Sequence, residues 1–372
     1  MMRLTIRLLA AVLAFSTVLV ACGDDEPEPA AAPEPAEAPA TTAAPEPAPA
    51  EEAPEPAASE DPTSLHIAVI FGNTADDTWS TSMLGALNRV TAEAPYDLDI
   101  TYEYFENISY ADGERVLRQT AETGEFDMII AHSTYSDSIY AIRDDFPEIL
   151  WSFTGSGNEG RGGNGYWLDV LPHEAAYLAG IAAGHLSETG MIGSVAAFPF
   201  PNVNGPVNGF FAGARSVNPD IETRVTYIES WFDPAAAQEA GAALIEEGAD
   251  SLYAASTFGT FQAALEADRV FTIGDLDDQE ALAPEVVITS VMILWDPGLK
   301  VLIDEWWAHE TAGEAYDAPT ERIQFYMSEG GADIAPMNEA LVPAEVIAEV
   351  NAARDQILNG ELVVEFNPGD VN

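Results

Sequence analysis

The sequence is poor in cysteine and in basic residues. Of its 372 residues, one is a cysteine, Cys22, and one is a lysine, Lys300. A single cysteine excludes an internal disulfide. Residues 63–372 carry 51 acidic against 11 basic side chains, a balance that disfavours nucleic acid and anionic membranes as partners because both need a basic surface. The same balance is expected of a protein adapted to high salt, where repulsion between like charges is screened.

Signatures of catalysis are also lacking. The chain has no Gly-Lys-Ser/Thr phosphate loop, and its five histidines are scattered. The stretch GSGNEG (155–160) matches G-x-G-x-x-G, but it runs into RGGNGYW instead of opening a helix, which indicates a mobile loop. His173 and Glu174 begin a zincin-like pattern, yet Tyr177 stands where the second histidine is required. We therefore expect no enzyme activity, no metal site and no cofactor.

The N-terminus has the build of an export signal. Arg3 and Arg7 precede an uncharged apolar run, 8–20, which is too short for a lasting transmembrane helix. The run ends in Leu-Val-Ala-Cys, and small residues before a cysteine at this place resemble the lipobox of bacterial lipoproteins. We predict a signal peptide at 1–21 and lipidation of Cys22, which excludes thiolate catalysis. The mature protein would then be exported and held at the extracytoplasmic face of the membrane by its lipid alone.

Residues 22–62 follow with almost only Ala, Pro, Glu, Asp and Thr, as in PEPAAAPEPAEAPATTAAPEPAPAEEAPEPAASE. Such a segment buries too little apolar surface to offset the entropy of ordering, and its prolines and like charges keep it extended. We predict a lipid-anchored, disordered tether. The alternative is a Pro-rich motif that binds a partner.

From residue 63 onward, apolar runs of strand length alternate with amphipathic runs of helix length. The expected strands are 65–72, 98–105, 126–133, 148–155, 191–198, 223–230, 251–256 and 270–275, and the expected helices are 79–94, 110–123, 137–146, 173–186, 203–216, a helix beginning after 234, and 261–268. This pattern indicates βαβ units with buried parallel sheets. We predict an α/β fold of two doubly wound, Rossmann-like lobes, about 63–186 and 187–290, with a hinge where 291–372 crosses between them. Ligands bind beyond the carboxyl ends of such strands, here in an interlobe cleft.

Two tryptophans occupy matching places in these lobes. Trp79 follows the first strand of lobe one, and Trp231 follows a strand of lobe two in SWFDP. Their indoles could close on the two faces of one flat ligand, while the carboxylate of Asp76 accepts hydrogen bonds from ring N–H or amino groups. The alternatives are that each Trp covers the end of its lobe's core and that Asp76 is the N-cap of the following helix.

Three longer stretches carry a family resemblance: GERVLRQTAETGEFDMIIAHS, AAYLAGIAAGHLSETGMIGSVAAFPFPNVNGPVNGFFAGARSVNPD and SWFDPAAAQEAGAALIEEGAD. Over about 65–366 the chain resembles the basic membrane protein (BMP) family of substrate-binding lipoproteins, which includes purine nucleoside receptors of ATP-driven importers. The resemblance implies a type I periplasmic binding protein fold that closes over a purine. It also implies a set of ligand contacts: Asp76, Trp79, Ser133 with its neighbour Asp137, Trp231, Phe258 and Gly259.

The chain departs from the nucleoside-binding members at two places. Ile293 stands where those members carry a lysine, and Leu276 stands where they carry an aspartate, and both of the lost groups are associated with ribose hydroxyls. These changes favour a free base as the ligand. Asp275 or Asp277 could nevertheless replace the missing carboxylate.

These observations favour a solute-binding lipoprotein of an ABC importer that takes up a purine nucleobase or nucleoside. Its expected partners are the permease subunits and, through the lipid anchor only, the membrane, and we expect it to be a monomer. The alternatives are a cell-surface sensor that presents its ligand to a receptor, a structural or adhesive lipoprotein, and a nucleoside hydrolase.

Overall fold

The computed structural model describes residues 61–255 and 259–371, which form two sheets of mostly parallel strands flanked by helices. The predicted signal peptide, Cys22, the tether up to residue 60 and Phe258 lie outside the described residues. Within the described ranges, no helix combines the length and the apolar character needed to cross a membrane.

The first sheet has the strand order β11-β5-β4-β3-β1-β2, and all of its strands run parallel. Its strands are β1 (Ser64–Phe71), β2 (Asp99–Phe105), β3 (Met128–His132), β4 (Leu150–Thr154), β5 (Gly165–Val170) and β11 (Ile323–Phe325). The first five strands follow the order 2-1-3-4-5, which defines one of the two common doubly wound sheets. The switch point of this order lies between β1 and β3.

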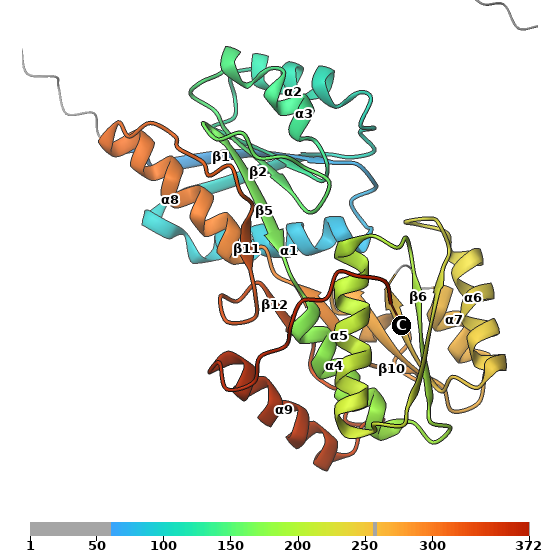
Figure 1. Ribbon diagram of the computed structural model, residues 1–372. Helices are drawn as coiled ribbons and strands as arrows, with labels where there is room; N and C mark the ends of the chain where they lie inside the picture. The colour runs from blue at the N-terminus through green and yellow to red at the C-terminus, as the bar shows by residue number, and fades with distance from the viewer. Residues whose placement is uncertain (1–60, 256–258, 372) are drawn as a thin grey trace, which may run out of the picture. The chain divides into compact units, whose positions relative to one another are not determined.

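Strand β1 shows why this sheet is buried on both faces. Leu65, Ile67 and Val69 point into one apolar cluster, and Ala68 and Ile70 point into another. Helices α1 (Thr78–Glu93) and α8 (Asp296–Ala312) cover the first face, whereas α2 (Gly113–Glu122) and α3 (Ser136–Tyr140) cover the second (Figure 1). A strand that is apolar on both sides reads as a continuous run, which is why its sequence predicted a parallel sheet.

The second sheet repeats the same plan in the order β12-β10-β9-β8-β6-β7. Its strands are β6 (Met191–Ala196), β7 (Glu222–Tyr227), β8 (Ser251–Ala255), β9 (Phe271–Leu276), β10 (Val287–Ile293) and β12 (Ala332–Ile334). Only the edge strand β12 is antiparallel to its neighbour among these described strands. The switch point of this sheet lies between β6 and β8.

Two helix pairs cover the second sheet. Helices α4 (His173–Leu186) and α5 (Pro201–Val217) lie on one face, and α6 (Pro234–Glu247) and α7 (Gly259–Leu265) lie on the other (Figure 1). Glycines bring α4 and α5 into close contact, because a Cβ at Gly180 would collide with the carbonyl of Phe210 and one at Gly213 with that of Tyr177. Helix α4 therefore packs with the second sheet, and a lobe boundary drawn by packing precedes this helix instead of following it at residue 186.

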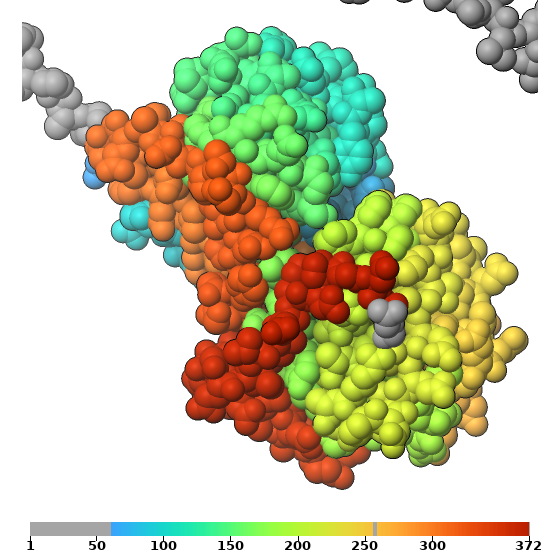
Figure 2. Space-filling view, in the orientation of Figure 1, coloured from blue at the N-terminus to red at the C-terminus, as the bar shows by residue number. Residues whose placement is uncertain are grey.

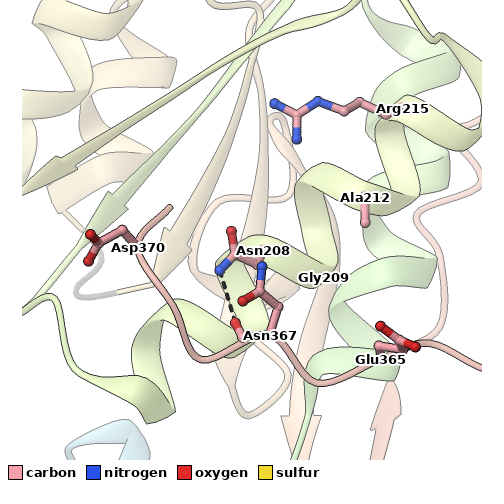
Figure 3. A pocket seen from close by; sticks show the side chains of 7 residues that line it. All are labelled: Asn208, Gly209, Ala212, Arg215, Glu365, Asn367 and Asp370. Carbon is pink, nitrogen blue, oxygen red and sulfur yellow. Dashed lines mark hydrogen bonds between the residues drawn. The ribbon is translucent and has the colours of Figure 1, made fainter. Parts of the chain in front are cut away.

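The described part of the C-terminal segment, 291–371, passes between the two sheets. It leaves β10 of the second sheet, packs α8 and β11 on the first, and returns to the second as β12 and α9 (Ala344–Leu358). The last described residues then lie across α5 (Figure 2). Asn208 Nδ2 of this helix donates to the carbonyl of Asn367 at 2.9 Å (Figure 3). An ion pair of 2.6 Å between Asp169 and Arg322 joins the ends of β5 and β11 near these crossings.

The α/β prediction of two doubly wound lobes is confirmed, and all eight expected strands form. Strands β5, β10, β11 and β12 and helices α8 and α9 were not foreseen. The helix expected at 137–146 stops at Tyr140 and is followed by a 3-10 turn, Arg143–Asp145. Pro147 disfavours helical backbone at Phe146, so this turn does not continue past Asp145. Short 3-10 turns also occur at Pro95–Asp97 and Glu280–Leu282.

Candidate ligand-binding site

The two switch points bring most of the predicted site residues to the carboxyl ends of the strands. In the first sheet, the loop after β1 leads to Trp79, and Ser133 directly follows β3. In the second sheet, Phe198 and Phe200 follow β6, and Trp231 follows the neighbouring β7. Chains diverge in opposite directions at a switch point and leave room there for a ligand.

Trp79 is partly buried and packs against His132. The two rings are stacked with centroids 4.7 Å apart and planes 18° apart. Two hydrogen bonds tie the same residues together: Trp79 Nε1 donates to the carbonyl of His132 at 3.1 Å, and His132 Nε2 lies 2.9 Å from the carbonyl of Trp79. The edge of Trp295 and the backbone at Gly155 complete the surroundings of the indole. Trp79 is therefore held in one orientation before any ligand arrives.

The hydrogen bonds of His132 define its tautomer. A carbonyl can only accept, so Nε2 must carry the proton that it shares with Trp79, and Nδ1 then accepts from the hydroxyl of Thr154 at 2.9 Å. Burial lowers the pKa of His132 to about 3, so the ring is neutral at ordinary pH. Sequence reasoning missed this residue because its signal is only one histidine at the end of an apolar strand.

The loop before α1 contradicts the alternative that Asp76 is the N-cap of this helix. The N-cap of α1 is Asp77, whose carboxylate accepts from the backbone N–H of Trp79 at 2.9 Å and from the hydroxyl of Ser80 at 3.0 Å. Asp76 is exposed and does not cap the helix. It lies in the loop between β1 and α1, one residue before the N-cap.

Ser133 and Asp137 flank the turn between β3 and α3. The hydroxyl of Ser133 lies 2.9 Å from that of Tyr110, an exposed residue after β2 that sequence reasoning placed in a helix. Asp137 is exposed and pairs with Arg161 at 2.6 Å. The hydroxyl of Ser133, paired with that of Tyr110, thus lies at the switch point. The negative charge of Asp137 is already balanced by Arg161.

The GSGNEG loop is fastened by its asparagine. Asn158 is buried, its Nδ2 donates to the carbonyls of Thr154, Gly155 and Ser133, and its Oδ1 accepts from the backbone N–H of Ser136 at 3.0 Å. The loop opens no helix, as expected. It differs from the expected mobile loop because Asn158 ties it to the Ser133 turn.

Trp231 joins two phenylalanines at the second switch point. Its ring centroid lies 5.0 Å from that of Phe198 and 6.1 Å from that of Phe200. Trp231 is 51% exposed, and the next residue, Phe232, is 63% exposed. The sequence FPFPN was part of the stretch that carried the family resemblance, but sequence reasoning did not single out its phenylalanines.

Gly259 begins α7 and lies against α6. A Cβ at this position would collide with the carbonyl of Pro234, so a glycine is required for the two helices to meet. This packing accounts for the glycine without a ligand. The neighbouring Phe258 lies outside the described residues.

Asp275 and Asp277 end β9 in different surroundings. Asp275 accepts a 2.5 Å hydrogen bond from the hydroxyl of Tyr253, and burial raises its pKa to about 7. The charge of Asp277 acts on Arg89 of α1, whose pKa is raised first by its hydrogen bond to Asp296 and further by the charges of Asp296 and Asp277. The charge of Asp277 is therefore partly offset by a cation from the first lobe.

The two residues that depart from the nucleoside-binding pattern, Ile293 and Leu276, both lie in apolar surroundings. Ile293 is buried in β10 and pairs with Ala332 of β12. Leu276 lies between the two aspartates with a positive φ of 72°, a strained conformation for a branched side chain. Neither position offers a hydrogen-bonding side chain.

Two surface pockets lie away from the switch points. One, of about 210 Å³, lies between α5 and the C-terminal residues and is lined by polar groups such as Asn208, Arg215 and Glu365 (Figure 3). The other, of about 280 Å³, lies at the amino ends of β6, β8 and β9 near Asp250 and Arg269. No cluster of three or more His, Cys, Asp or Glu side chains suited to a metal occurs in residues 61–255 and 259–371.

Comparison with known sequences gives a family match and several relatives. Residues 65–364 match the Bmp family, described as ABC transporter substrate-binding protein, PnrA-like. A Haloferax volcanii protein, named provisionally as an ABC transporter glucose-binding protein, is 32% identical over 281 residues, covering 74% of this chain and 68% of the relative. A purine-binding protein from Brucella abortus is 28% identical over 265 residues, covering 70% of this chain and 71% of the relative.

Solved structures support the architecture. An ABC transporter solute-binding protein from Conexibacter woesei superimposes with a TM-score of 0.66 at 24% identity, covering 82% of this chain and 99% of that chain. A transcriptional activator from Bacillus halodurans gives a TM-score of 0.65 at 21% identity, covering 81% and 100% of the two chains. These likenesses concern the fold, which is that of type I periplasmic binding proteins.

Proposed function

The chain belongs to the Bmp family of ABC transporter substrate-binding proteins, and on that premise we propose that it is the extracytoplasmic, lipid-anchored receptor of an importer for a purine base or nucleoside. The observation that carries the proposal is the pair of aromatic groups at the two switch points, Trp79 in the first sheet and Trp231 in the second. A flat base stacked on such rings gains about 1 to 3 kcal/mol per contact. The family's role in ABC transport makes permease subunits the expected partners.

The charge of the site favours a neutral ligand. A phosphate would need arginine or lysine side chains or a nest of backbone amides. The carboxyl end of β9 offers Asp275 and Asp277 instead, and Arg89, whose charge interacts with that of Asp277, already pairs with Asp296 at 2.7 Å. Nucleotides would therefore meet repulsion that a base or nucleoside avoids.

Between base and nucleoside, the base is favoured. A ribose placed against Ile293 and Leu276 would leave hydroxyls without partners, at a cost of about 1 to 3 kcal/mol for each buried hydroxyl. Asp275 and Asp277 remain the carboxylates that could bind a ribose, although Asp275 already accepts a hydrogen bond from Tyr253. We expect a free base to bind at least as tightly as its nucleoside.

A sugar is the second candidate ligand. It is favoured by one observation, the provisional glucose-binding name of the relative that is 32% identical. A hexose would need several polar side chains around its hydroxyls, in addition to one aromatic face. The hydroxyls of Ser133 and Tyr110 are the described groups that could begin such a set.

Calorimetric titration of residues 61–372 with adenine, adenosine, adenosine 5′-monophosphate and glucose at matched salt tests the proposal. Adenine should bind at least as tightly as adenosine, and the monophosphate should hardly bind. Recovery of intact adenosine after binding would exclude a hydrolase. Tight binding of glucose without binding of any purine would overturn the purine assignment, and adenosine binding ten times tighter than adenine would show that Asp275 or Asp277 has taken over the ribose.

A further inference from the structure

Three aromatic rings of the second lobe form two surfaces inclined to each other. Phe198 and Phe200 make one of these walls, and Trp231 makes the other. The rings of Phe198 and Phe200 are nearly parallel, with planes 12° apart and centroids 5.2 Å apart. The indole of Trp231 is inclined to them by 57° and 47°, respectively. We call these three side chains the aromatic corner. A flat ring placed in it can contact one wall with its face and the other with its edge, the two geometries that aromatic pairs prefer.

The corner is rigid before any ligand binds. Prolines follow both phenylalanines in Phe198-Pro199-Phe200-Pro201, and each proline fixes its own backbone and restricts the residue before it. The N–H of Phe200 donates to the carbonyl of Phe198 at 2.8 Å, closing a tight turn. The carbonyl of Phe200 in turn accepts from the first N–H groups of α5. A ligand that meets this corner therefore pays little ordering entropy.

Two of the three rings are exposed, and polar side chains beside Trp231 are already engaged. Phe200 is 47% exposed and Trp231 is 51% exposed. On the Trp231 loop, the hydroxyl of Ser230 accepts from the N–H of Phe232, and the carboxylate of Asp233 accepts from the N–H of Ala236 at the start of α6. The exposed recognition surface at this place is consequently aromatic, and contiguous exposed aromatic surface is a common mark of a binding site.

We propose that Phe198 and Phe200, together with Trp231, contact the flat ring of the ligand and select a bicyclic base over a monocyclic one. This inference rests on the proposed function and adds two specificity-determining residues to it. The selection arises because a bicyclic ring can cover one wall while its far edge reaches the other. A single six-membered ring can satisfy only one of these contacts well.

Titration of Phe198→Ala and Phe200→Ala with adenine and with cytosine tests this inference. We expect each substitution to weaken adenine binding about tenfold and to weaken cytosine binding much less, so that the ratio of the two affinities falls. Phe200→Tyr should restore the ratio, because it restores the wall. The matched control is Phe232→Ala on the same loop, whose side chain is more exposed and has no ring contact among the described residues.

The outcomes separate this inference from the function on which it rests. If the unsubstituted protein binds no purine base, the proposed function fails and the inference fails with it. If adenine binds and both phenylalanine variants keep the unsubstituted affinities, the proposed function stands and the inference is overturned. An equal loss for adenine and cytosine, or a fall in the melting temperature that matches the loss, would also overturn the selective role.

Discussion

Trp79 and Trp231 occupy equivalent places in the two lobes but differ in their support. The first indole is stacked on His132 and hydrogen-bonded to its carbonyl, while the second is half exposed and packs against the rings of Phe198 and Phe200. The alternative that a tryptophan covers the end of a core therefore fits Trp79 better than Trp231. The proposal that both contact the ligand is compatible with this difference, since a fixed ring is a good stacking partner.

This difference predicts separate effects on stability and binding. Trp79→Ala should lower the free energy of unfolding by about 3 kcal/mol, because it removes a packed ring and its hydrogen bond. Trp231→Ala should change it by less than about 0.5 kcal/mol, as for other exposed positions. Denaturant unfolding without ligand measures both, and adenine titration should show about a tenfold loss in each. A large loss of stability in Trp231→Ala would contradict its assignment to an open site.

The carboxyl group of Asp275 links stability to pH. Its pKa is raised by burial to about 7 in the folded protein, whereas in the unfolded chain it titrates near 3.8. Between these values the folded state holds a proton that the unfolded state has released, so the contribution of Asp275 to stability falls as pH rises from about 4 to 7. Below pH 4 both states are protonated, and the contribution is fully present.

Asp275→Asn should remove this pH dependence while keeping an acceptor for Tyr253. Above pH 7 the free energy of unfolding of the variant should exceed that of the unsubstituted protein by on the order of 2 to 3 kcal/mol, a value discounted for solvent screening. At pH 4 the difference should be small. Urea unfolding at both pH values and constant salt measures the gain. Parallel pH profiles for the two proteins would show that Asp275 ionises normally.

At the scale of elements, glycine contacts set the distance between α4 and α5. Gly180 faces the carbonyl of Phe210 on the partner helix, and Gly213 faces that of Tyr177. Backbones approach this closely only where no side chain intervenes. The pairing explains why α4 packs with the second sheet, although it follows β5 of the first in sequence.

Gly213→Ala should therefore force the helices apart. We expect a loss of about 2 to 3 kcal/mol in the free energy of unfolding, typical of overpacking. Gly85→Ala in α1 is the matched control, since its Cβ would meet only the flexible end of Arg89, and it should be neutral or stabilising by about 0.5 kcal/mol. Thermal unfolding of both variants decides the point, and equal melting temperatures would contradict the close packing.

Local sequence patterns predicted the order of strands and helices along the chain, but they did not predict which elements pack against one another. Apolar runs such as LHIAVIFG and FDMIIAHS predicted β1 and β3 because strands buried on both faces leave a continuous signal. The three-residue strands β11 and β12 have no period long enough to detect. They form because the crossing chain meets an open sheet edge beside β5 and β10.

At the scale of the whole molecule, export and anchoring depend on residues outside the described ranges. The charge balance of 51 acidic to 11 basic side chains in residues 63–372 gives no basic surface for anionic lipid. Retention at the membrane would then rest on a lipid at Cys22. This remains a prediction from the sequence.

Cys22→Ser should release the protein from the membrane fraction. A signal helix of this length would be cleaved or only weakly retained, and none of the described helices can span a membrane. Fractionation of cells that express the two forms measures the release, with the unsubstituted protein as the control. A variant that still sediments with membranes after a high-salt wash would refute lipid anchoring through Cys22.

The sequence by itself determined the alternation of strands and helices, the two-lobe architecture and the family, because each rests on patterns within thirty or so neighbouring residues. It also placed Trp79 and Trp231 after their strands. Only the tertiary structure decided that Asp77 and not Asp76 caps α1, that His132 holds Trp79, and that Phe198 and Phe200 meet Trp231. The cap of α1 is a local contact that either aspartate could have made. The other contacts join residues that end or follow different strands, and the register that brings them together is set by packing across the whole sheet, which no local pattern records.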